Sequence, residues 1–197
     1  MKVLNIIMIA AAAVTLASCG GAEEQTAEKT TYSLDLNKSS LKWKGSKSAD
    51  YFHTGSVKFL DGSVEMEGDK LVSGSFTIDM NSIVPEDKEL PAEKKEYLAA
   101  HLKDTAFFFA AEFPKVTVTI DGYEGGKLST TINVRGQEIK ESVPVKLTST
   151  DKNLTIAGKF SIDFAALKMA GMEPDPESGE KIQSKVEYDL NLTLDKK

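Results

Sequence analysis

Two histidines are the side chains of this sequence best suited to acid–base chemistry. His53 and His101 are the only histidines, and an imidazole can serve as a general base, a metal ligand or a hydrogen-bond donor. No group of Cys and His residues has the spacing of a metal site, and no nucleophile elbow, P-loop or dinucleotide fingerprint is present. We therefore predict a protein that is not an enzyme, with no catalytic residues, no metal and no cofactor. His53 and His101 remain candidate polar contacts, and a hydrolase that pairs either one with a carboxylate remains the alternative.

The single cysteine follows a stretch typical of a secretory signal. Lys2 supplies the positive charge, and residues 6–16 form an apolar run that is shorter than the roughly 20 residues needed to span a bilayer. Leu16-Ala17-Ser18-Cys19-Gly20 resembles a bacterial lipoprotein processing site. The resemblance implies that residues 1–18 are removed and that Cys19 carries acyl chains such as palmitate. An ordinary cleavage site beside a bystander cysteine is the alternative.

The segment after the cysteine predicts a tether to a membrane. Residues 19–31 are small, polar and acidic and lack apolar periodicity, which is typical of a flexible linker. Several acyl chains on Cys19 would hold the protein stably at a membrane. Gly20 and Gly21 follow the cysteine with no Asp next to it, and by analogy with enterobacterial sorting this favours the outer membrane. We expect a location in the bacterial cell envelope, with the membrane face left open.

Length and charge restrict the remaining possibilities. Residues 32–197 are enough for one domain with a substantial core. The net charge is −6, and it becomes −7 once Lys2 is removed with the signal. Arg135 is the only arginine, whereas nucleic-acid binding needs clustered Lys and Arg. We therefore expect no nucleic-acid partner.

Apolar residues recur at every second position in segment after segment, which predicts half-buried strands. The segments are 41–43, 57–66, 72–80, 116–120, 128–134, 139–147, 154–162 and 186–194. Turn residues punctuate them at Asp61-Gly62, Gly68-Asp69, Gly125-Gly126, Arg135-Gly136 and Asp151-Lys152-Asn153. The pattern predicts an all-β fold, a closed antiparallel barrel of about eight strands, with a two-sheet sandwich as the alternative.

Two segments interrupt the strands. Residues 91–103 carry helix signals: Pro91 near the start, acidic residues early and Lys103 at the end. Tyr97 and His101 are four apart, as are Leu98 and Leu102, so these side chains share a helix face that can cap one barrel end. Residues 164–182 begin with a helical turn and continue into a stretch rich in Gly and Pro, which predicts an exposed loop.

The segment from Gly74 to Pro114 resembles the YceI-like polyisoprenoid-binding family. It contains Asp79-Met80 with Ser82-Ile83 at a strand end, then His101-Leu102, then Phe107-Phe108 and Phe113-Pro114; His53-Thr54-Gly55 also matches the family pattern. The resemblance implies a lipocalin-like barrel that holds a long apolar chain. Asp163 stands where family members often carry a basic residue, which puts a headgroup contact at that end in doubt.

The residues of the predicted inner face are of very unequal size. Gly55, Gly74, Thr130 and Gly158 share the apolar register with much larger neighbours, which favours a cavity; the alternative is that the glycines mark bulges or bends. With the resemblance, the expected apolar lining is Trp43, Phe59, Phe76, Ile78, Leu102, Phe107, Phe108, Val118, Ile132, Phe160 and Leu190.

The predicted function is therefore that of a membrane-anchored lipoprotein. It binds a polyisoprenoid or similar long apolar lipid inside the barrel, for storage, shielding or transport. The alternative is an interaction or structural lipoprotein with a filled barrel that acts through its loops.

Overall fold

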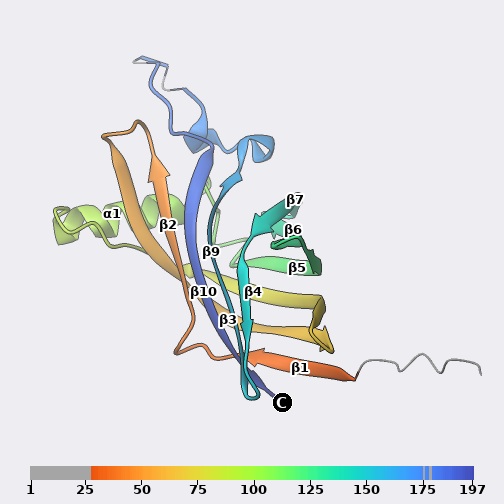
Figure 1. Cartoon of the computed structure of the whole chain (residues 1–197). Helices are drawn as coiled ribbons and strands as arrows, with labels where there is room; N and C mark the ends of the chain where they lie inside the picture. The colour runs from red at the N-terminus through yellow and green to blue at the C-terminus, as the bar shows by residue number, and fades with distance from the viewer. Residues whose placement is uncertain (1–27, 175, 178) are drawn as a thin grey trace, which may run out of the picture.

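The computed structural model describes residues 28–174, 176–177 and 179–197. The secondary structure of these residues is mostly β, with one α-helix (Figure 1). The elements are β1 (Lys29–Leu34), β2 (Ser40–Ser46), β3 (Phe52–Glu67), β4 (Lys70–Pro85), α1 (Ala92–Lys103), β5 (Lys115–Glu124), β6 (Lys127–Val134), β7 (Gln137–Pro144), β8 (Lys146–Ser149), β9 (Asn153–Asp163) and β10 (Lys185–Lys196). Two short 3-10 turns, η1 (Ala165–Leu167) and η2 (Ala170–Met172), lie between β9 and β10.

The strands form one antiparallel sheet that curls into a barrel, which confirms the predicted fold class and excludes the two-sheet sandwich. Ten strands occupy eight positions around it. β1 and β2 lie end to end in one position, because each pairs with both β3 and β10. β7 pairs with β6 and β8 pairs with β9, so the chain bends at Pro144 and links the two ends of the sheet. The apolar series predicted over 139–147 is thus divided between two strands, β7 and β8, which together occupy one strand position of the barrel.

The predicted turn at Asp61-Gly62 is wrong. β3 runs unbroken from Phe52 to Glu67, and the register against β4 shifts between Phe59 and Asp61. The ring of Phe76 lies where a side chain of Gly62 would be. Gly62 therefore lets this ring pack against the backbone of a β-bulge, and it does not mark a chain reversal. The other predicted turns connect consecutive strands.

The barrel domain begins earlier than the sequence suggests. Lys29, Thr30 and Thr31 were expected in the tether, yet they form the first half of β1 and pair with β3. Apolar alternation could not reveal this part of β1, because its side chains are polar. The pairing is made by the backbone and by an ion pair between Lys29 and Glu67 at 3.3 Å. The predicted signal peptide, Cys19 and most of the tether lie outside the described residues.

The helix occupies the predicted place, from Ala92 to Lys103 directly after Pro91, and packs against β4. The 164–182 segment is only partly the exposed loop that was expected. Phe164, Leu167 and Met169 are each at most 5% exposed. The backbone N–H of Gly171 donates to the carbonyl of Ala106 at 2.8 Å. The first half of this segment therefore closes part of the barrel wall.

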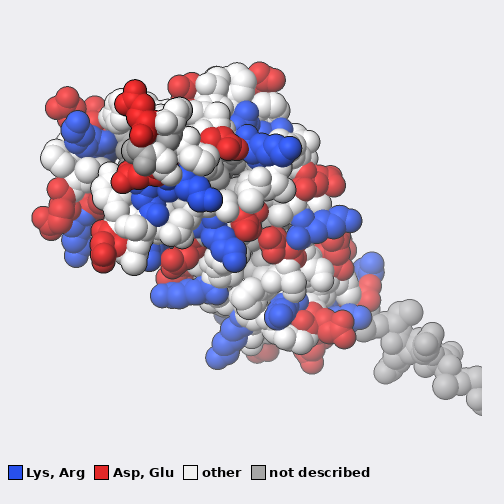
Figure 2. Space-filling model, turned by 90° about the horizontal axis from the view of Figure 1, so that it is seen from above, with Lys and Arg blue, Asp and Glu red and all other residues white. Residues whose placement is uncertain are grey.

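One end of the barrel is solid. Val64, Leu71, Leu154, Ile156 and Leu194 are fully buried, and the strand register places them near β1 and the end of β10. Figure 1 shows β1 and the C-terminus together at this end of the barrel. The helix and the β2–β3 hairpin lie at the opposite end. Basic and acidic side chains are interspersed over the face shown in Figure 2, without an extended basic patch. Among the described residues, no helix has the length and apolar character needed to cross a membrane.

Candidate functional site

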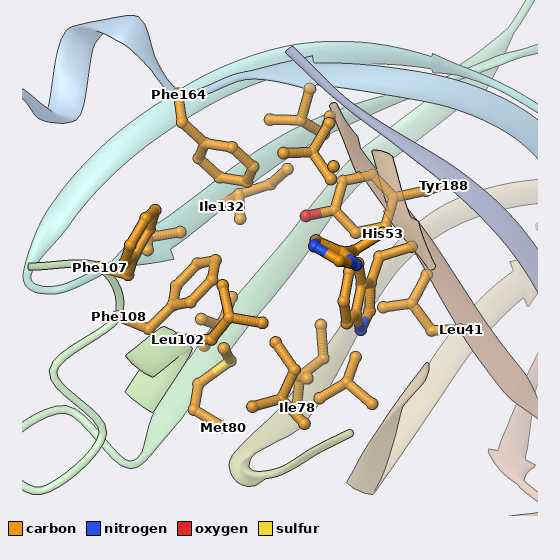
Figure 3. Close-up of a pocket in the computed structure, with 18 of the residues that line it drawn as sticks. Leu41, His53, Ile78, Met80, Leu102, Phe107, Phe108, Ile132, Phe164 and Tyr188 are labelled. Atoms are coloured by element: carbon orange, nitrogen blue, oxygen red, sulfur yellow. The ribbon is translucent and has the colours of Figure 1, made fainter. Parts of the chain in front are cut away.

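The other end of the barrel is hollow. A chamber of about 600 Å³ lies between the inner face of the sheet, α1 and the segment that follows β9 (Figure 3). This volume falls within the range of roughly 300–1,000 Å³ typical of sites for small organic ligands. Its walls are almost entirely aliphatic and aromatic. The residues that fill the β1 end of the barrel stop the chamber from running through the whole sheet.

All eleven apolar residues predicted from strand parity and the family resemblance lie on the chamber wall. They are Trp43, Phe59, Phe76, Ile78, Leu102, Phe107, Phe108, Val118, Ile132, Phe160 and Leu190. His53 and His101 line it as well. The structure therefore brings the whole predicted set together, while contact between these side chains and a ligand stays a prediction.

The glycines do not create this space, and that part of the sequence reasoning is wrong. A Cβ on Gly158 would clash with the carbonyl oxygen of Pro144, and one on Gly55 would clash with the carbonyl oxygen of Val84 and with the indole of Trp43. A Cβ on Gly74 would lie 2.8 Å from Val64. These glycines permit close approach of neighbouring chain segments, so larger residues there would disrupt packing and would not probe the chamber.

The three consecutive phenylalanines take three different directions. Phe107 is 2% exposed, and its ring packs on Gly171 and meets the ring of His101 edge-on at 5.0 Å. Phe108 lines the chamber and meets the ring of Phe164 edge-on at 6.1 Å. Phe109 adopts φ 46°, which turns its ring away to pack against Phe113. The rings of Phe107 and Phe108 thus belong to the chamber wall, and the ring of Phe109 stabilises the chain reversal that positions them.

The entrance lies between the β2–β3 hairpin and α1. Tyr51, Phe52 and Tyr97 belong to the chamber wall and are nevertheless 58%, 43% and 70% exposed, which marks the rim. Lysines accompany the aromatic rings: Lys44 Nζ lies 4.7 Å from the Phe52 ring centre, and Lys47 Nζ lies 6.0 Å from that of Tyr51. Tyr97 lies on the helix face that was expected to cap one barrel end. Tyr51 and Phe52 were not predicted, because the hairpin that projects them has no strict alternation.

His53 is held by a carboxylate at the entrance. Its Nδ1–H donates to Asp87 Oδ2 at 3.1 Å, and both side chains are half-buried. Asp87 Oδ1 also accepts from the backbone N–H of Thr54 at 2.9 Å and from its hydroxyl at 3.2 Å. His101 instead stacks on Tyr97 at 6.0 Å. Within the described ranges, His, Cys, Asp and Glu side chains form no group of three that could hold a metal ion.

Tyr188 is a polar wall residue that sequence reasoning missed. Its ring stacks on Phe160 at 5.7 Å, and its accessible part faces the chamber. Burial raises the pKa of the Tyr188 hydroxyl far above its usual value, so the group stays neutral. None of the described residues makes a hydrogen bond to this hydroxyl. The only available signal was its parity with Val186 and Leu190, which places it on the inner face.

Asp163, the predicted departure from the family pattern, lies outside the chamber wall. Its carboxylate accepts from the backbone N–H of Ala165 at 3.0 Å, at the start of η1. This bond, followed by one from the Ser184 hydroxyl, holds the pKa of Asp163 below its usual value. The residue therefore shapes the chain after β9 and does not face the chamber.

Comparison with known proteins places this architecture in context. The model of a family described as the YceI-like domain matches residues 32–194. A polyisoprenoid binding domain from Saccharophagus degradans, implicated in plant cell wall breakdown, superposes with a TM-score of 0.64 and 18% identity, covering 83% of this chain and 97% of that one. BcnA from Burkholderia cenocepacia superposes with a TM-score of 0.65 and 19% identity, covering 81% and 98% respectively. Such identities show a shared fold alone. No curated protein matches the chain.

Proposed function

Because the chain belongs to the YceI-like family, we propose that its chamber binds a polyisoprenoid or a similar long apolar lipid. The observation that carries this proposal is the chamber itself, which is apolar, blind at its inner end and open at an aromatic rim. The description of a structural relative as a polyisoprenoid binding domain supports the same ligand class. The protein stores, shields or transports the lipid.

The energetics favour recognition of a chain over recognition of a headgroup. Each methylene transferred from water to an apolar wall contributes about 0.8 kcal/mol, so ten contribute about 8 kcal/mol before the entropic cost of association, which is at least about 4 kcal/mol. This attraction is not directional. It suits a long flexible hydrocarbon and tolerates variation in chain length.

We further propose that the lipid leaves chemically unchanged. The His53–Asp87 pair has the geometry of a general base, but His53 faces an apolar space in which Tyr188 is the neighbouring polar group (Figure 3). The pair therefore orients a ligand. It activates no nucleophile.

Purified protein is expected to carry a lipid. The full-length Cys19→Ser variant, which cannot be acylated at that position, would be purified without detergent and extracted with organic solvent. Mass spectrometry is expected to find one dominant class of long-chain lipid at about one molecule per protein. Protein that is empty, and that also ignores added polyprenols and fatty acids, would contradict the proposal.

We also propose that Cys19 anchors the protein in the bacterial envelope, at the outer membrane. Cells fed labelled palmitate are expected to incorporate the label into the wild-type protein and into none of the Cys19→Ser variant. The wild type is expected in the membrane fraction and the variant outside it, because several acyl chains hold stably at a bilayer. An unlabelled wild-type protein, or a variant that stays with membranes, would show that the attachment has another origin.

A further inference from the structure

We propose that His53 and Tyr188 form a polar subsite that selects a lipid ending in a neutral hydroxyl group. This inference rests on the proposed function and adds to it the chemistry of the ligand's head. The subsite lies near the entrance, so the hydroxyl group would stay close to the rim while the apolar chain enters the chamber.

The sheet register brings the two side chains to one wall. Tyr188 on β10 pairs with Trp43 on β2, and Trp43 pairs with Gly55 on β3. His53 lies two residues before Gly55 on the same strand, so its side chain points to the same face. Figure 3 shows the Tyr188 hydroxyl and the His53 imidazole directed toward each other across this wall. No direct hydrogen bond among the described residues joins them.

Both groups are positioned before any ligand arrives. The ring of Tyr188 is stacked on Phe160. The ring of His53 is bonded to Asp87 and meets Tyr51 edge-on at 5.5 Å. Fixed orientation lowers the entropic cost of a hydrogen bond to a ligand, so these two groups can discriminate between headgroups that the apolar wall cannot tell apart.

Their hydrogen-bonding roles are complementary. When His53 Nδ1–H donates its hydrogen bond to Asp87, the corresponding tautomer of the imidazole has Nε2 as an acceptor. The Tyr188 hydroxyl is a free donor. An alcohol oxygen can accept from Tyr188 while its own proton goes to His53 Nε2, and both bonds form on a single atom of the ligand. A bare hydrocarbon leaves both protein groups without a partner, which is costly in an apolar chamber.

A phosphorylated head fits this subsite poorly. The Asp87 carboxylate already lies behind the imidazole, and Tyr188 contributes no charge. Arg135, the single arginine, is engaged elsewhere, because its Nη1 donates to the backbone carbonyl of Phe107 at 2.6 Å. Lys47 and Lys94 line the outer part of the chamber, and Lys47 pairs with Glu180. An anion at Tyr188 would lose its hydration without a matching cation.

The test compares the affinities of one protein for three ligands that share the same isoprenoid chain. Geranylgeraniol, the hydrocarbon that lacks its hydroxyl, and geranylgeranyl phosphate would be offered from phosphatidylcholine vesicles to full-length Cys19→Ser protein. The alcohol is expected to bind about tenfold more tightly than the hydrocarbon and more tightly than the phosphate. Tyr188→Phe and His53→Leu are each expected to weaken alcohol binding by about 3- to 10-fold, the size of one hydrogen bond, and to leave hydrocarbon binding as tight as in the wild type or tighter, because each removes a polar group that the hydrocarbon leaves without a partner.

Tyr123→Phe is the matched control. It also removes a tyrosine hydroxyl, one that donates to the Val145 carbonyl at 3.3 Å, and Tyr123 lies outside the chamber wall. It is expected to leave all three affinities unchanged. Equal binding of alcohol and hydrocarbon, tighter binding of the phosphate, or a preference that survives both Tyr188→Phe and His53→Leu would overturn the polar subsite while leaving chain binding intact. Failure of the hydrocarbon and the alcohol alike would instead overturn the proposed function.

Discussion

Val118→Trp is expected to block lipid uptake while leaving the barrel folded. Val118 lies in the middle of β5, between Phe76 and Ile132, and its side chain points into the chamber. If the indole displaces about three methylenes of the ligand, the loss of about 2.4 kcal/mol corresponds to roughly 50-fold weaker binding. Stability should change by less than about 1 kcal/mol, because the new ring enters empty space. Lipid binding and thermal unfolding, measured on the same protein, give both quantities.

Val64→Trp is the matched control for that experiment. Val64 is also an inward-pointing valine on a long strand, but it is fully buried in the solid end of the barrel. The same ring is expected to overpack this site and to cost at least about 1–3 kcal/mol of stability. If both variants lose stability equally, or if Val118→Trp protein takes up lipid as the wild type does, the division into a solid and a hollow end is wrong.

Phe107→Ala is expected to cause the largest loss of stability among single substitutions in the chamber wall. Its ring fills the space above Gly171, and its carbonyl accepts from Arg135. The ring thus packs the segment after α1 against the segment after β9, while the backbone carbonyl, which the substitution keeps, bonds the β6–β7 turn. Truncation of a buried phenylalanine costs about 3–5 kcal/mol, which lowers the melting temperature of a domain of this size by about 10 °C. Calorimetry of the full-length Cys19→Ser protein with and without the substitution measures the difference.

Phe109→Ala tests whether the effect of Phe107→Ala comes from the burial of the Phe107 ring or from the loss of any phenylalanine in this segment. The ring of Phe109 is only partly buried and packs against Phe113 outside the chamber. Its removal is expected to cost less than about 1 kcal/mol and to leave lipid binding unchanged. A larger loss for Phe109→Ala than for Phe107→Ala would show that the chain reversal, and not the buried ring, holds the chamber wall together.

Strand parity was sufficient to assign the strand residues of the chamber wall to the inner face, whereas Leu102, Phe107 and Phe108 were predicted from the family resemblance. Successive side chains in a strand point to opposite faces, so a residue such as Phe160 or Leu190 can be assigned to the interior from its neighbours alone. The family was also recognisable, because His101-Leu102 and Phe107-Phe108 stand in a fixed order between two strands, and the match over 32–194 confirms it.

Parity could not show where the interior is empty. Val64 and Val118 are both inward-facing valines, and the difference between them arises from residues far away in the sequence, such as Leu154 and Leu194, which fill one end. The filled-barrel alternative therefore describes the end around Val64 and fails at the end around Val118. Parity also cannot show where two chain segments approach closely: Gly158 is small because the Pro144 carbonyl lies against it, and not because it borders empty space.

The polar part of the site was hidden for a related reason. Asp87 lies 34 residues after His53, and Tyr188 reaches the same wall only through two intervening strand pairs. Neither relation leaves a local pattern. The sequence indicated which face each residue occupies, and only the closed barrel determines which of those residues meet.

A crystal structure of the full-length Cys19→Ser protein, purified without detergent, tests the central claim most directly. We predict continuous tubular electron density from the entrance at His53 and Tyr188 to the inner wall at Thr130, with a length that matches an extended lipid chain. A chamber that has collapsed, or that contains only separate water molecules, would contradict the account.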